Sequence, residues 1–109
     1  MTELPKNILD ELYDVIASRR GGDPEKSYTA KLFSRGRGKI AQKVGEEAVE
    51  TTIAALTESK ERLISESADL LYHLMVMWAD RDVTPAQVWA ELEHRRGTTG
   101  VDQKKLKNR

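Results

Sequence analysis

The chain has 109 residues, no cysteine, and 18 acidic and 18 basic side chains. A chain of this length supports one core, so we predict a single domain over residues 1–109. The lack of cysteine excludes disulfides and thiolate metal sites. The start, "MTELPKNILDEL", does not resemble a secretory signal, and the longest apolar stretch, "LLYHLMVMWA", is too short to span a bilayer. We therefore expect a cytoplasmic protein with no membrane partner.

The zero net charge hides a strong segregation of charge along the chain. Residues 19–43 carry eight basic and two acidic side chains, residues 44–93 carry three basic and eleven acidic ones, and residues 94–109 are again basic. A solvated surface mosaic explains such blocks. A site that binds a metal ion through its acidic part and phosphate through its basic part explains them equally well. Nucleic-acid binding is a weaker alternative, because the acidic middle repels phosphates and no aromatic residues interleave with the basic runs.

Apolar residues recur at helical spacing throughout, and no stretch alternates like a strand. The first predicted helix covers residues 5–19, with Pro5 at its first position, and ends at the turn-rich "RRGGDPE". A short segment, "SYTAKLF", then leads into "SRGRGK", whose two glycines predict a flexible basic loop. Two longer helices follow, from about Lys39 to Leu56 and from about Glu61 to Ala79.

A capping box predicts the start of the last helix: Thr84 precedes Pro85, and Gln87 is the third helical residue. Its expected core residues are Val88, Trp89 and Leu92. Residues 97–109 are predicted to form glycine turns and a basic tail. The predicted fold class is all-α, an antiparallel helical bundle of about four to five helices.

The two long predicted helices each carry one narrow polar strip on an otherwise apolar surface. The strip on the first helix contains Lys43, Glu46, Glu47 and Glu50. The strip on the second contains Glu66, Asp69, His73 and Asp80. A helix that is apolar over most of its circumference is buried in a bundle or an oligomer, so these strips are not ordinary solvent-facing surface.

The short connection between these helices predicts an antiparallel hairpin, in which residues equidistant from the turn lie at the same level. Counted from Glu58, Glu50 lies level with Glu66, and Glu47 lies level with Asp69. If the two polar strips face each other, four carboxylates converge within about one helical turn, ~5 Å of axis.

Carboxylates that converge in this way repel one another and need protons or cations to be stable. An all-oxygen ligand set, with one histidine at its margin, favours Mg²⁺, with Mn²⁺ as the alternative, over Zn²⁺. Such an ion neutralises phosphate groups and lowers the pKa of a bound water. Ordinary alternatives exist for single residues. Lys43 can simply pair with Glu47, His73 is expected to hydrogen-bond a neighbour such as Asp69 rather than bind metal, and Asp80 is expected to be exposed.

These residues resemble a known family. "EEAVE" at 46–50 and "ESAD" at 66–69 are similar to the EExxE…ExxD signature of the all-α nucleoside-triphosphate pyrophosphatases, the MazG-like superfamily. With "SYTAKLFSRGRGKIAQKVGEEAVE", "ESADLLYHLMVMW" and "ELEHRRGTTG", residues 5–105 resemble the phosphoribosyl-ATP pyrophosphatases. The resemblance implies Mg²⁺-dependent hydrolysis of the substrate phosphoribosyl-ATP to phosphoribosyl-AMP and pyrophosphate, the second step of histidine biosynthesis. It also implies that a homodimer completes the bundle.

The resemblance implies roles for individual residues as well. The implied metal ligands are Glu47, Glu50, Glu66 and Asp69. The implied catalytic carboxylates are Glu46, Glu47 and Glu50, with the division of roles between Glu46 and Glu47 left open. The implied phosphate contacts are Lys31, Arg35, Arg37, Lys39, Lys43, Arg95 and Arg96, with "SRGRGK" as a mobile clamp. Two alternatives stay open: a housecleaning (d)NTP pyrophosphatase, and a non-catalytic dimerisation module whose carboxylates bind structural cations.

Overall fold

A computed structural model describes residues 7–96, which form five α-helices. They are α1 (Ile8–Ser18), α2 (Tyr28–Arg35), α3 (Arg37–Thr57), α4 (Lys60–Asp80) and α5 (Pro85–Arg96). No strand occurs within these 90 described residues, so the prediction of an all-α fold with four to five helices is confirmed. The predicted helix start at Pro5 and the predicted basic tail at 97–109 lie outside the described residues. In the described part, α1 begins at Ile8, where the Asn7 side chain accepts a hydrogen bond from the Leu9 amide.

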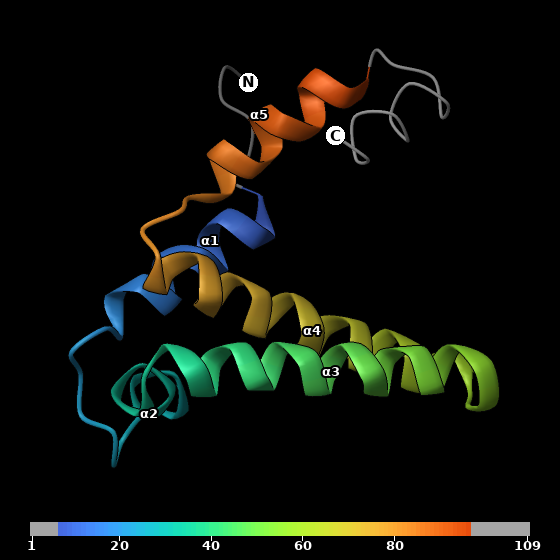
Figure 1. Ribbon diagram of the computed structural model, residues 1–109, viewed down its shortest axis with the longest axis horizontal. Coiled ribbons are helices and arrows are strands. Elements are labelled where there is room, and N and C mark those ends of the chain that lie inside the picture. Colours follow the sequence, from blue (N-terminus) through green and yellow to red (C-terminus); the bar gives the residue numbers. More distant parts are fainter. Residues whose placement is uncertain (1–6, 97–109) are drawn as a thin grey trace.

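The long helices α3 and α4 lie side by side as an antiparallel hairpin (Figure 1). The hairpin turn is short: α3 ends at Thr57, and the Ser59 side chain caps α4 by accepting a hydrogen bond from the Arg62 amide. At the end of the hairpin far from this turn, α1 packs on α4, and α2 packs on both α3 and α4. Helix α5 packs on α1. We call the helix-covered part the packed end, and the part near the turn the open end.

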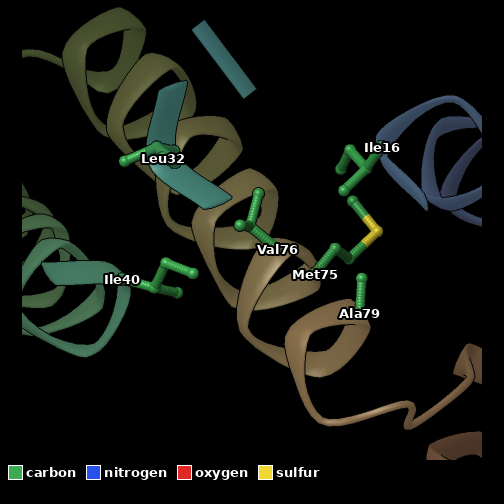
Figure 2. Close-up of a cluster of buried hydrophobic side chains, with 6 residues drawn as sticks. All are labelled: Ile16, Leu32, Ile40, Met75, Val76 and Ala79. Carbon is green, nitrogen blue, oxygen red and sulfur yellow. The ribbon is translucent and has the colours of Figure 1, made fainter. Parts of the chain in front are cut away.

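The buried core lies at the packed end and is organised around the second half of α4. Figure 2 shows Met75 and Ala79 directed toward Ile16 of α1, while Val76 is directed toward α2 and α3. The buried residues of this cluster are Ile16, Leu32, Ile40, Met75, Val76 and Ala79. The second half of α4 is thus covered by α1 on one side and by α2 and α3 on the other.

The basic segment "SRGRGK" is not a flexible loop, so that prediction was wrong. Ser34 and Arg35 belong to α2, Arg37 already begins α3, and Gly36 alone separates the helices. Gly36 has φ +94°, a conformation that L side chains rarely adopt, so one glycine produces the whole bend. The second glycine, Gly38, lies in the first turn of α3, where the helix continues through it.

A hydrogen-bonded corner fixes the C-terminal end of α4 to the preceding helices. Arg20 donates to the Ala79 carbonyl at 2.8 Å and also pairs with Asp82. Tyr13 donates its hydroxyl to the Val83 carbonyl at 2.7 Å, and burial raises the pKa of this phenol. Arg20 thus adds a donor to a carbonyl in the last turn of α4, and Tyr13 holds the segment that follows the helix.

Asp80 belongs to the same corner, which corrects its predicted exposure. Its carboxylate accepts a 2.6 Å charge-assisted hydrogen bond from Arg37 Nε, and its side chain is only 15% exposed. The bend at Gly36 directs the start of α3 toward the end of α4, and this long-range approach cannot be inferred from local spacing.

The capping box of α5 is confirmed. The Thr84 hydroxyl accepts from the Gln87 amide, and the Gln87 side chain accepts from the Thr84 amide at 2.9 Å. Trp89 packs edge-on against Trp78 and donates its indole N–H to Asp10. Leu92 is exposed, so its prediction as a core residue was wrong: α5 packs on α1, and through Trp89 on Trp78 of α4, with a face that leaves Leu92 open to solvent. No helix within residues 7–96 is both long enough and apolar enough to cross a membrane.

Candidate metal and phosphate site

Three carboxylates converge where α3 and α4 face each other. Glu47 of α3 and Glu66 and Asp69 of α4 each offer an oxygen, and these oxygens lie within 4.8 Å of one another. Glu47 is 7% and Glu66 6% exposed, whereas Asp69 is open to solvent. We call these three residues the acidic cluster. The hairpin and its predicted register therefore bring together three of the four expected ligands.

Thr51 ties the two helices together beside the acidic cluster. Its hydroxyl lies 2.7 Å from the Glu47 carbonyl and 3.1 Å from the Glu66 carbonyl, so it reaches from α3 to α4. A hydroxyl within hydrogen-bond reach of both helices fixes their relative level more closely than apolar packing does.

The two glutamates of the "EE" doublet point to different surroundings. Glu47 enters the acidic cluster, whereas Glu46 is exposed and accepts a 2.8 Å hydrogen bond from Gln42. That hydrogen bond and the nearby Lys43 lower the pKa of Glu46. The Lys43 ammonium lies between the two glutamates, 3.3 Å from a Glu46 oxygen and 3.7 Å from a Glu47 oxygen. The predicted pairing of Lys43 with Glu47 is thus confirmed.

Glu50, the fourth expected ligand, is exposed and is not among the three carboxylates that meet within 4.8 Å. It is nevertheless close enough for its charge to act on Glu66. The level of Glu50 was predicted from the turn, but a level does not fix the direction in which a flexible side chain points.

Glu66 is the electrostatic centre of the acidic cluster. Burial raises the pKa of its carboxyl; Arg62 opposes this effect, and the charges of Glu50, Asp69 and Glu47 add to it. Arg62 donates to Glu66 Oε2 at 2.5 Å, but the buried Oε1 has no hydrogen-bond partner among residues 7–96. A buried carboxylate oxygen without a partner is costly, so this atom is suited to bind a cation.

His73 acts through hydrogen bonds, as predicted. Its Nδ1 lies 2.8 Å from the Asp69 backbone carbonyl and its Nε2 lies 3.0 Å from the Tyr28 hydroxyl. A carbonyl can only accept, so Nδ1 donates to Asp69, while Nε2 and the Tyr28 hydroxyl are joined by the second hydrogen bond. Tyr28 is thereby oriented by α4, although the residue is 52% exposed. A neighbouring pair, Thr29 and Tyr72, is also joined through its hydroxyls.

Four of the predicted phosphate contacts line one pocket of about 190 Å³ next to the acidic cluster. The cationic side chains in its lining are those of Lys31, Arg35, Lys39 and Lys43. Tyr28, Leu32 and Glu46 complete it. We call it the cationic pocket. Lys43 belongs to the pocket and also approaches Glu47, so the basic and acidic parts of the site are adjacent.

The other three predicted phosphate contacts lie elsewhere. Arg37 is occupied by Asp80 at the packed end. Arg95 and Arg96 lie at the end of α5, where they pair with Glu91 and Glu93. Because α5 packs on α1, the structure does not bring these two arginines to the acidic cluster.

Sequence reasoning missed three residues of the site: Thr51, Arg62 and Tyr28. Arg62 had a readable signal, because it stands four residues before Glu66 on the same helix. Thr51 stands four residues after Glu47, but this spacing is equally common in helices without a site. Nothing local indicated that Tyr28 reaches His73, 45 positions further along the chain.

The donor set of the acidic cluster fits a hard divalent cation. All three side chains offer carboxylate oxygen, the ligand that Mg²⁺ and Mn²⁺ prefer. The partnerless oxygen of Glu66 supports the fit. With only three carboxylates in close reach, coordination positions remain for water or for a phosphate oxygen.

Comparison with known proteins gives a consistent result. A family model described as "Phosphoribosyl-ATP pyrophosphohydrolase" matches residues 9–96. The chain is 71% identical to the phosphoribosyl-ATP pyrophosphatase of Paramagnetospirillum magneticum over 98 residues, which is 90% of either chain. It is 60% identical over 112 residues to the protein of the same name from Rhodospirillum rubrum, covering 95% of this chain and 96% of the other. A relative of that name from Azospirillum brasilense is 61% identical over 97 residues.

Proposed function

This chain belongs to the phosphoribosyl-ATP pyrophosphohydrolase family, and from that premise we propose how its site works. The reaction is the hydrolysis of phosphoribosyl-ATP to phosphoribosyl-AMP and pyrophosphate, the second step of histidine biosynthesis. Water adds to one phosphorus of the α–β anhydride, the bridging P–O bond breaks, and the proton of the water is released. The observation that carries the proposal is the acidic cluster beside the cationic pocket.

Glu47, Glu66 and Asp69 would hold Mg²⁺, with Mn²⁺ as a substitute and Glu50 at the border of the site. When bound, such an ion neutralises phosphate charge and lowers the pKa of a coordinated water. Because Asp69 is exposed, an ion can reach the site from solvent, whereas buried Glu47 and Glu66 fix the position of the site. Glu46, which is ionised and turned toward Lys43, orients that lysine rather than binding the ion.

The cationic pocket would hold the phosphate groups of the substrate. Lys31, Arg35 and Lys39 approach it from α2 and the first turn of α3. Their charges attract a polyanion, and Gly36 holds the two helices at the angle that forms the pocket. A rigid bend thus takes the role that a mobile clamp was expected to have. Arg37, Arg95 and Arg96 are not part of this proposal.

We also propose a homodimer formed through the open end of the hairpin. Ile64 and Leu71 are exposed and lie on the same face of α4 as Met75, which α1 covers. The covered apolar face thus continues without cover toward the turn. On α3, the exposed residues Val49 and Ile53 form another stripe. A second copy would bury both.

The names of the relatives favour phosphoribosyl-ATP over a general (d)NTP as substrate. A cytoplasmic location is part of the proposal and remains a prediction.

Pyrophosphate release from phosphoribosyl-ATP tests this function. We expect release with Mg²⁺, none with EDTA, and a kcat/KM for phosphoribosyl-ATP well above that for dATP. Asp69→Asn should be inactive, whereas Glu61→Gln, which removes an exposed carboxylate from the same helix, should be active. Equal kcat/KM values for the two substrates would assign a general nucleotide pyrophosphatase. Mg²⁺-dependent stabilisation without any pyrophosphate release would leave only a dimerisation module.

A further inference from the structure

Arg62 lies in the first turn of α4 and contacts two glutamates, Glu58 at the hairpin turn and Glu66 one turn further along α4. Its Nη2 donates to Glu66 Oε2 at 2.5 Å, and its Nε lies 3.4 Å from Glu58 Oε1. The arginine side chain is 56% exposed, whereas the side chain of Glu66 is only 7% exposed. Arg62 therefore reaches inward from solvent to a buried carboxylate.

The two oxygens of Glu66 have different surroundings. Oε2 is occupied by Arg62, but Oε1 is buried and has no hydrogen-bond partner within the described residues. A charge-assisted hydrogen bond to one oxygen restricts rotation of the carboxylate about its last torsion, which is otherwise broad. Contact with Arg62 therefore determines where the free oxygen points.

Arg62 and the other α4 ligand, Asp69, stand on opposite sides of Glu66 along the helix. Along α4, Arg62 stands four residues before Glu66, toward the turn, whereas Asp69 stands three residues after it. This order puts Arg62 and Asp69 in different turns of α4, on either side of Glu66. A cation at the cluster would not need to displace the arginine.

We propose that Arg62 is a positioning residue: it holds the Glu66 carboxylate with Oε1 free and directed for capture of a divalent cation by Glu47, Glu66 and Asp69. This inference rests on the proposed function, which supplies the cation site. Glu58 assists by holding the far side of the guanidinium at the hairpin turn. The site is then preorganised before any ion arrives, and ion binding does not have to order a free side chain.

Calorimetric titration of the full chain with Mg²⁺, and separately with Mn²⁺, tests the proposal. Arg62→Met keeps the apolar stem and removes the guanidinium. Lys60→Met is the matched control, because it removes one positive charge from an exposed residue in the same helical turn. Loss of an outer partner of a metal ligand typically weakens metal binding 10- to 100-fold, and for this half-exposed arginine we expect about 10-fold. Arg62→Lys should recover part of the loss.

The outcomes separate this inference from the proposed function. If the wild type binds neither ion, the proposed function fails. If the wild type binds and Arg62→Met matches Lys60→Met, or binds more tightly, only the positioning role of Arg62 is overturned. Unfolding curves recorded in EDTA identify a purely structural effect, because that would lower the melting temperature and leave Kd unchanged. Glu58→Gln, which loosens Arg62 without touching the acidic cluster, should weaken binding by less than Arg62→Met; no weakening would remove Glu58 from the account.

Discussion

The two ends of the α3–α4 hairpin differ in how they are covered and in which side chains lie between the helices. At the packed end, α1 and α2 cover the hairpin, the cluster around Met75 and Val76 is buried, Arg20 donates to the Ala79 carbonyl in the last turn of α4, and Tyr13 donates to the Val83 carbonyl just after it. Toward the open end, carboxylates lie buried between the same two helices and apolar side chains such as Ile64 are exposed. Within residues 7–96, helices of the same chain cover one end, whereas the other carries the sites proposed for a cation and a second copy.

This difference indicates where function is located. Packing at one end fixes the relative level of α3 and α4, and that level brings Glu47 opposite Glu66 and Asp69 at the other. Converging carboxylates destabilise a fold unless a cation joins them. The packed end therefore provides the stability that the acidic cluster requires, and substitutions at the two ends should fail in different ways.

The largest effect is expected at the exposed apolar stripe. Ile64→Glu would place a charge in the proposed dimer interface in both copies. Burying one isoleucine contributes about 1.5–3 kcal/mol, so two copies give about 3 kcal/mol or more, which weakens dimerisation roughly 100-fold or more. Sedimentation equilibrium measures the dissociation constant of the dimer. Leu92→Glu, an exposed leucine on α5, is the control. An Ile64→Glu protein that dimerises like the wild type would contradict the open end as an interface.

The next largest effect is expected from a substitution that creates a cavity at the packed end. Met75 is fully buried between α4 and α1, so Met75→Ala should lower the free energy of unfolding by about 3 kcal/mol. Urea unfolding of the protein in EDTA measures the change. Val15→Ala, on the exposed face of α1, should cost well under half as much. Equal losses from the two substitutions would mean that the cluster in Figure 2 is not the main core.

Glu47→Gln, in contrast, should lower activity without lowering stability. Removing a ligand should lower kcat at least about 100-fold, more than the usual loss from an outer partner. In EDTA the melting temperature should not fall, because one of three repelling charges is gone. Pyrophosphate release and a thermal scan on the same sample measure both. A marked loss of stability without cation would mean that Glu47 is mainly a structural partner of Lys43.

Much of this comparison could be predicted from the sequence, because it depends on local periodicity. Helical spacing gave the long helices within a few residues, and counting from Glu58 gave the level of Glu47 and Asp69. Spacing along one helix fixes levels but not the direction of a flexible side chain. The sequence therefore did not separate exposed Glu50 from buried Glu47.

Features that depend on distant segments could not be predicted. The bend at Gly36 replaces a loop and leads Arg37 to Asp80, and the partner of His73 is Tyr28 on another helix. These contacts follow from how α1 and α2 cross the hairpin, and that arrangement depends on the packing of the whole core. Four lysines and arginines were correctly grouped by their block of charge, but Arg37 in the same block is directed elsewhere.

The smallest expected effect concerns the corner. Tyr13→Phe removes the hydrogen bond to the Val83 carbonyl and should cost about 1 kcal/mol. Burial raises the pKa of Tyr13, so the neutral phenol is favoured in the folded state. Its stabilising effect is complete below the ordinary tyrosine pKa, about 10, and is lost as the pH rises through the folded-state pKa. Urea unfolding at neutral and alkaline pH should thus show that the difference in free energy of unfolding between the wild type and Tyr13→Phe becomes smaller as the pH rises. A difference that grows with pH would contradict this sign.

The central claim is that the open end holds a divalent cation between the two helices of the hairpin. Diffraction at the manganese absorption edge, from crystals grown with Mn²⁺, locates such an ion directly. We predict an anomalous peak within about 2.5 Å of carboxylate oxygens from Glu47, Glu66 and Asp69, with Oε1 of Glu66 among the ligands. A peak held by other residues, or none in crystals of protein that Mn²⁺ activates, would contradict the account.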